Sequence, residues 1–208
     1  MKFKINRVII HLILSDIFIL SAFGLISPIF AIFIREGISG GSILAAGIAS
    51  SIFWVVKSLA QLPLSIYIDK RKEKLSLLLI GTFLIVIVPL IYAFSPHVNF
   101  IYFAQAIYAL GAAMAYPAWF SLFTLHLDKR HRGFEWSLWS TGIGLGSAAT
   151  AYFGAKLAEI IGFKILFFVV SGVSFIGMLI LFHIGKKYLK AVEKVGYFLL
   201  PKFNNSKK

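Results

Sequence analysis

Cysteine is absent from this 208-residue chain, and acidic residues are scarce. Without a thiol the protein has no disulfide, no thiolate metal ligand and no cysteine nucleophile. Eight aspartates and glutamates stand against 21 lysines and arginines, and charged residues make up only 14% of the sequence. A water-soluble domain of this size carries far more charge on its surface. The composition therefore excludes a disulfide-stabilised secreted domain and argues against any water-soluble fold.

Apolar residues are abundant instead, at 59% of the chain, and the mean hydropathy is +0.88. Crossing the hydrocarbon core of a bilayer takes about 20 apolar residues in a helix. Six runs reach this length between charged or turn residues: 8–34, 41–68, 75–94, 100–125, 136–157 and 163–184. The sequence predicts an all-α integral membrane protein with a six-helix transmembrane domain over residues 1–184 and a basic tail over 185–208. The first run is too long for the apolar part of a cleaved signal peptide, so we expect it to be retained.

Basic residues gather on one side of the predicted spans. Seventeen of the 21 lie in the amino terminus, the connections 69–74 and 126–135, and the tail. Basic connections stay in the cytoplasm, and an even number of spans returns the chain to the side where it began. We expect a multi-pass protein of the plasma (inner) membrane with both termini in the cytoplasm and no nucleic-acid partner. The tail either lies on anionic lipid headgroups or is a solvated anchor for the last span.

The histidines fall in connections or near the ends of spans, and no two of them have the spacing of metal ligands. They are His11, His97, His126, His131 and His183. We predict no metal and no cofactor.

Two ionisable residues, Asp16 and Lys57, fall inside predicted spans. A charge at the centre of the bilayer costs about 2.5–3.5 kcal/mol even on a lenient insertion scale. At about 1.5 Å per residue, Asp16 lies ~13 Å beyond Arg7 and Lys57 lies ~18 Å from Asp69, so their depths nearly agree. An ion pair between them would relieve the cost of burying both charges. Such a pair is either static or coupled to substrate or proton.

Further polar and aromatic side chains share these helices or face them. Gln61 and Trp54 lie one turn to either side of Lys57 on the same helix face. The predicted substrate or coupling-ion pathway consists of Asp16, Lys57, Gln61, Trp54, Gln105, Tyr116, Trp119 and Trp139.

A faint internal repeat accompanies this pattern. Shifting the chain by about 90 residues lays Pro28 on Pro117 and Asp69 on Glu159. With three helices in each unit, the two units must be inverted relative to each other. We therefore expect two inverted three-helix repeats.

Two stretches resemble a known family. "QLPLSIYIDKRKEKLSLLLIG" is similar to the loop between helices two and three of the major facilitator superfamily, with Asp69 in its acidic position. "LDKRHRGFEWSLWSTGIGLGSAATAYFGAKLAEIIGFKILFFV" resembles the fourth loop and glycine-rich fifth helix of the same family, with an Arg-Gly pair at 132–133. The resemblance covers residues 7–184 and implies the amino-terminal six-helix half of a twelve-helix fold.

The resemblance also implies roles for residues at the cytoplasmic side. A gating charge cluster would consist of Asp69, Lys70, Arg71, Asp128 and Arg132. Small residues allow helices to approach closely. Those expected to pack the fifth helix are Gly142, Gly144 and Gly146.

These features predict a half-sized secondary active transporter of the major facilitator type rather than an enzyme. Alternating access would require a parallel homodimer or a separate second six-helix half. One alternative is a fragment or split-gene half of a twelve-helix transporter. The other is a six-helix intramembrane protease, but its candidates Ser171, Ser174 and His183 share one helix. The sequence does not identify the small molecule or ion that is carried.

Overall fold

The computed structural model describes residues 5–70 and 74–184, and these residues are helical with short connections. The elements in chain order are α1 (Arg7–Gly24), the 3-10 helix η1 (Ser27–Ile29), α2 (Phe30–Gly37), α3 (Ile43–Lys70), α4 (Lys74–Ala93), α5 (Val98–His126) and α6 (Arg132–Ile184). Five helical segments of the described chain are long and apolar enough to cross a membrane. The all-α class predicted from composition is confirmed.

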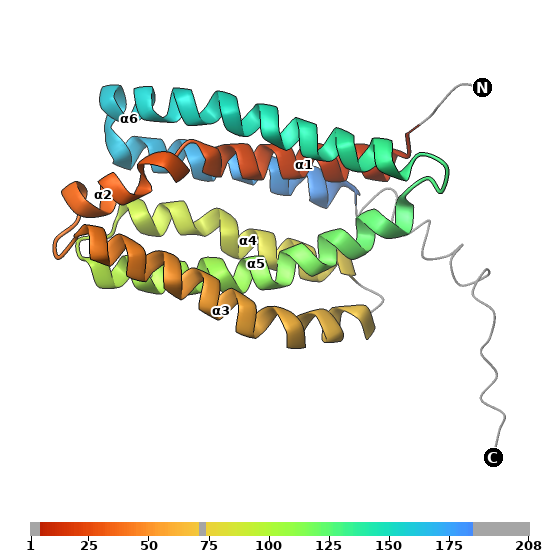
Figure 1. Ribbon diagram of the computed structural model, residues 1–208, viewed down its shortest axis with the longest axis horizontal. Coiled ribbons are helices and arrows are strands. Elements are labelled where there is room, and N and C mark those ends of the chain that lie inside the picture. Colours follow the sequence, from red (N-terminus) through yellow and green to blue (C-terminus); the bar gives the residue numbers. More distant parts are fainter. Residues whose placement is uncertain (1–4, 71–73, 185–208) are drawn as a thin grey trace, which may run out of the picture.

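The longest element, α6, is two antiparallel arms rather than one straight helix. At about 1.5 Å per residue, its 53 residues would otherwise extend roughly 80 Å. Gly162 interrupts it with φ of 75° and ψ of 163°, a conformation that L side chains rarely adopt. Figure 1 shows the ribbon of α6 doubling back, so the first arm (132–161) and the second arm (163–184) lie side by side. A glycine thus makes the turn between the predicted spans 136–157 and 163–184.

The predicted first span, 8–34, is not one continuous helix. Within this range α1 ends at Gly24, the 3-10 helix η1 follows, and α2 begins at Phe30. Pro28 lies inside this break, where its missing N–H and the clash of its ring with the carbonyl four residues earlier disfavour a continuing α-helix. The amides of Leu25 and Ile26 instead bond to carbonyls three residues earlier, which tightens the chain into 3-10 geometry.

The helices pack in two groups (Figure 1). On one side α1 lies between the two arms of α6, and on the other α4 and α5 pack together with α3 laid along α5. The start of α1 and the α3–α4 and α5–α6 connections lie at one end of the bundle. The turns after α2, after α4 and at Gly162 lie at the opposite end.

Glycines on the first arm of α6 bring it against α1. A Cβ on Gly142 would lie 2.5 Å from Cδ1 of Ile17, and a Cβ on Gly146 would overlap Oγ of Ser21. Further along, a Cβ on Gly154 would overlap the carbonyl oxygen of Leu25. Gly144 differs, because a Cβ there would meet nothing within 4 Å. Of the three predicted packing glycines, two pack inside the described chain and Gly144 lies on an open face.

Candidate functional site

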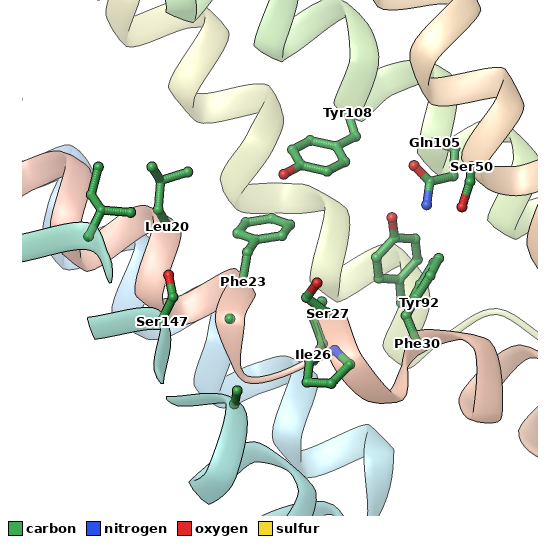
Figure 2. A pocket seen from close by; sticks show the side chains of 14 residues that line it. Leu20, Phe23, Ile26, Ser27, Phe30, Ser50, Tyr92, Gln105, Tyr108 and Ser147 are labelled. Carbon is green, nitrogen blue, oxygen red and sulfur yellow. The ribbon is translucent and has the colours of Figure 1, made fainter. Parts of the chain in front are cut away.

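A cavity lined in part by polar side chains lies between the two helix groups, toward the end opposite the basic connections. Its volume is about 570 Å³, within the range of small-molecule sites. Its lining comes from α1, η1, α2, α3, α4, α5 and the first arm of α6. The polar lining residues are Ser27, Ser50, Tyr92, Gln105, Tyr108 and Ser147 (Figure 2). The remaining lining residues are mainly apolar, so the cavity combines apolar walls with several neutral hydrogen-bonding groups.

The broken first span forms one wall of this cavity. Phe23, Ile26, Ser27 and Phe30 all face it, and Figure 2 shows the Phe23 ring lying flat against Tyr108. The centroids of these two rings are 4.9 Å apart and their planes differ by 17°. Interrupted helices expose backbone groups at binding sites near the middle of transporters. The break in the helix therefore coincides with the site.

Asp16 is buried on α1 just below this cavity. Its carboxylate Oδ2 accepts a hydrogen bond of 2.6 Å from the indole Nε1–H of Trp139, 123 residues away on α6. Asp16 lines a second, much smaller cavity together with Tyr116 and Trp119. Leu20 and Tyr108 line both cavities, so the two are neighbours. Four of the predicted pathway residues (Asp16, Tyr116, Trp119 and Trp139) are thereby brought together.

An aromatic cluster surrounds the Asp16–Trp139 hydrogen bond. Trp119 lies 5.3 Å from Trp139 and stacks on Phe123 at 4.6 Å between centroids. The Trp119 Nε1–H donates to the carbonyl of Leu12, at 3.3 Å, and so joins α5 to α1. Such ring contacts add about 0.5–1.5 kcal/mol each beyond area burial. The cluster ties α1, α5 and the first arm of α6 together at one level.

Lys57 does not pair with Asp16, which corrects the sequence prediction. No ion pair joins these two side chains in the part of the chain that the structure describes. The Lys57 ammonium lies instead over the rings of Phe53, Trp54 and Tyr116, at 5.7, 4.9 and 4.5 Å from their centroids. The physical reason is helix rotation: α3 packs on α5, which presents Tyr116 to Lys57, whereas Asp16 faces α6.

The other predicted pathway residues are placed less tightly. Gln105 is buried in the wall of the larger cavity, Gln61 is half-buried on α3, and Trp54 is 60% exposed. The exposed face of Trp54 belongs to the side of α3 that no described helix covers.

The predicted gating residues belong to two separate networks. Asp69 forms an ion pair with Lys74 at 3.5 Å, and Lys74 also donates to Oγ of Ser121 at 2.6 Å. These contacts join the ends of α3, α4 and α5. Lys70 is exposed at the end of α3, while Arg71 lies outside the described residues.

Asp128 organises the turn before α6. Its carboxylate accepts from the backbone N–H of Arg130 at 2.9 Å and lies 3.0 Å from Nδ1 of His131. These hydrogen bonds, that from the Arg130 amide first, hold the pKa of Asp128 below its ordinary value. Arg132, the first residue of α6, is exposed beside this turn.

Sequence reasoning missed several residues. Glu135 is fully buried, and its Oε2 accepts from the backbone N–H of Asp128 at 3.0 Å. Its position two residues after the Arg-Gly pair was the available signal. Tyr92, Ser50 and Phe53 carried no signal, because aromatic and small polar residues recur throughout these helices.

Metal ligation was expected to be absent. Across residues 5–70 and 74–184, the structure brings together no group of three histidine, aspartate or glutamate side chains that could hold a metal ion.

A bundle of long apolar helices around a cavity with neutral polar groups is typical of membrane proteins that bind small molecules. The family model of the Major Facilitator Superfamily matches residues 12–203. The chain belongs to this family, as the loop signatures predicted.

Among solved structures, the chain is similar to one titled "In meso crystal structure of the POT family transporter PepTSo". The TM-score is 0.75 at 17% sequence identity, and the match covers 89% of this chain. It covers 39% of the other chain, so this chain spans about two fifths of the length of that transporter. A search of curated proteins gave no match.

Proposed function

We propose that this chain is a half-sized secondary active transporter that carries a small molecule or ion by alternating access. In this proposal each arm of α6 is one crossing, which makes six crossings in two inverted three-helix repeats. The amino terminus, the α3–α4 and α5–α6 connections and the tail lie in the cytoplasm of a cell with a plasma (inner) membrane. The observation that carries the proposal is the 570 Å³ cavity, to which both helix groups contribute.

The open face of the bundle supports a second half. Leu59 and Leu62 on α3 are 74% and 72% exposed, and Ser58 on α3 and Gly144 on α6 are exposed as well. A polar cavity open to lipid is unfavourable, because hydrocarbon cannot hydrogen-bond to it. Two copies in parallel orientation would cover this face, as would a separate six-helix half. The alternative is that the chain is a fragment or split-gene half of a twelve-helix transporter.

The enzyme alternative has little support in the structure. The Oγ of Ser171 donates to the backbone carbonyl of Val86 at 2.9 Å, inside the contact between α6 and α4. A nucleophilic serine needs a histidine within hydrogen-bond reach, and His183 lies three turns further along the same arm.

Alternating access is tested by reaching the cavity from each side of the membrane. Because the chain has no cysteine, single-cysteine variants need no prior substitutions. Ser50 is exposed in the cavity wall, and its neighbour Ala49 is fully buried. We expect a Ser50→Cys variant to react with a membrane-impermeant maleimide added to either side, and an Ala49→Cys variant to react from neither. Reaction of the Ser50→Cys variant from one side alone would contradict alternating access.

The second half is tested by crosslinking in membranes. We expect Gly144→Cys and Ser58→Cys variants, on the open face, to form disulfide-linked dimers on mild oxidation. A Leu179→Cys variant is the matched control, because Leu179 is 48% exposed on the second arm of α6, away from the cavity. Monomers alone at all three positions would remove the homodimer and leave the separate second half.

A further inference from the structure

Lys57 lies among three aromatic rings, an aromatic cage, halfway along the length of the bundle. It lies halfway along the 28-residue α3, and its Nζ is within 6 Å of three ring centroids: Phe53 at 5.7 Å, Trp54 at 4.9 Å and Tyr116 at 4.5 Å. Ring faces attract an ammonium group through their quadrupoles at such distances. These contacts fix where the positive charge lies, and they come from both α3 and α5.

The cage holds the charge without neutralising it. In the described parts of the chain no carboxylate forms an ion pair with Lys57, and Asp16 is engaged by Trp139. An ammonium group carries three N–H donors, and ring faces are poor acceptors compared with an anion. Lys57 is only half-buried, so a ligand can reach it from the open face. The cage is therefore a preformed cationic site in surroundings of low dielectric.

An apolar surface connects this site to the larger cavity. Ser50, in the cavity wall, lies seven residues before Lys57, which places both on one face of α3 about 10 Å apart. Between them, the ring of Phe53 packs at 4.6 Å against Tyr108, which also lines the cavity. None of the described residues lining the larger cavity is an aspartate or a glutamate. A ligand here meets one cation, flat aromatic walls and neutral donors.

We propose that the cargo is an organic anion, with its carboxylate or similar group on Lys57 and a flat apolar body along Phe53 and Tyr108. This inference rests on the proposed transport function and names its substrate class. The buried Asp16 accepts its hydrogen bond from Trp139 and forms no ion pair with Lys57 in the described chain, which leaves the Lys57 ammonium available to the anion.

The test measures equilibrium binding of radiolabelled benzoate to the full chain in lipid nanodiscs. We expect saturable binding that weakens at least tenfold in the Lys57→Gln variant and changes less than threefold in Lys57→Arg, which keeps the charge. The matched control is Lys164→Gln, since Lys164 also lies over a ring, that of Phe94 at 5.1 Å, but sits beside the Gly162 turn and lines neither cavity. The control should bind like wild type.

Competition then tests the chemistry of the ligand. Unlabelled 2-naphthoate, which reaches further toward the cavity, should displace benzoate more strongly than benzoate itself, whereas neutral benzamide and cationic benzylammonium should not. Absence of saturable benzoate binding, binding that survives Lys57→Gln, or displacement by benzylammonium would each overturn the proposal. Any of these results would leave alternating access intact if the Ser50→Cys variant still reacts from both sides. Conversely, the Ser50→Cys variant could react from one side alone while benzoate binding still depends on the charge of Lys57. That result would contradict alternating access and support the anion site.

Discussion

The two helices that carry a charge at mid-depth, α1 and α3, are packed in opposite ways. Gly142 and Gly146 of α6 press against α1, and the indole of Trp139 holds Asp16. In contrast, α3 packs chiefly on α5, leaves large apolar side chains uncovered and surrounds Lys57 with rings. The carboxylate of Asp16 is thus held inside the described bundle, whereas the ammonium group of Lys57 lies at its edge.

This difference indicates a division of roles between the helices. A side chain pinned by a short hydrogen bond across closely packed helices keeps its position, whereas one on a helix held along a single seam remains accessible. In the proposed transporter, the α1–α6 unit would be the fixed wall of the cavity, and α3 the wall that meets a ligand or a second half. The following changes break or sharpen that contrast.

The largest effect is expected from filling the seam between α1 and α6. Leucine in place of Gly154 would collide with the backbone of Leu25, which cannot swing aside as a side chain can. Overpacking of this kind costs about 1–3 kcal/mol or more. We expect folded yield, measured by size-exclusion chromatography in detergent, to fall to near background. Gly144→Leu on the same arm has open space and should express like wild type; equal loss in both variants would contradict this packing.

The next effect concerns the partner of Asp16. A double-mutant cycle between Asp16→Leu and Trp139→Phe should give a coupling energy of about 1–3 kcal/mol, because each single change leaves a buried polar group unpaired. The same cycle between Asp16→Leu and Lys57→Met should give roughly 0.5 kcal/mol or less. Thermal unfolding of all variants in one detergent measures both. A larger coupling for Lys57 than for Trp139 would restore the ion pair predicted from sequence.

A smaller effect is expected from removing the charge on α3 alone. Lys57→Met deletes a cation whose burial is costly, on the order of 2.5–3.5 kcal/mol at the bilayer centre, and loses cation–π contacts worth about 0.5–2 kcal/mol. We expect stability to be unchanged or raised by about 1 kcal/mol, while benzoate binding is lost. A clear fall in melting temperature would mean that Lys57 has a structural counter-charge.

The smallest effect is the pH dependence of the exposed turn before α6. Hydrogen bonds from the Arg130 amide and His131 hold the pKa of Asp128 below its ordinary value, so folding favours the carboxylate. The contribution is present above about pH 4 and is lost as the pH falls through the lower pKa of the folded state. Asp128→Asn should melt slightly below wild type from pH 8 to pH 5, and the gap should close below pH 4. A gap that widens in acid would contradict this sign.

Much of this protein follows from local sequence. Long apolar runs predict helices because hydrocarbon length is a property of consecutive residues, and the all-α class is confirmed. The Arg-Gly pair before a glycine-rich helix and the acidic residue before the basic loop predicted the major facilitator family, which the family match confirms. Pro28 was visible as well, yet the chain around the break packs Gly24 against Thr150 and Leu25 against Gly154, which no local pattern reveals.

The sequence by itself determined how far along their helices Asp16 and Lys57 lie, because each residue adds a constant rise, counted from the charged end of the helix. Only the tertiary structure decided what they touch. Each residue also turns a helix by about 100°, so equal depth says nothing about direction. Packing of α1 against α6 orients Asp16 toward Trp139, and packing of α3 against α5 orients Lys57 toward Tyr116. Side-chain partners at one level are chosen by the rotation of packed helices, which depends on contacts between residues far apart in the chain.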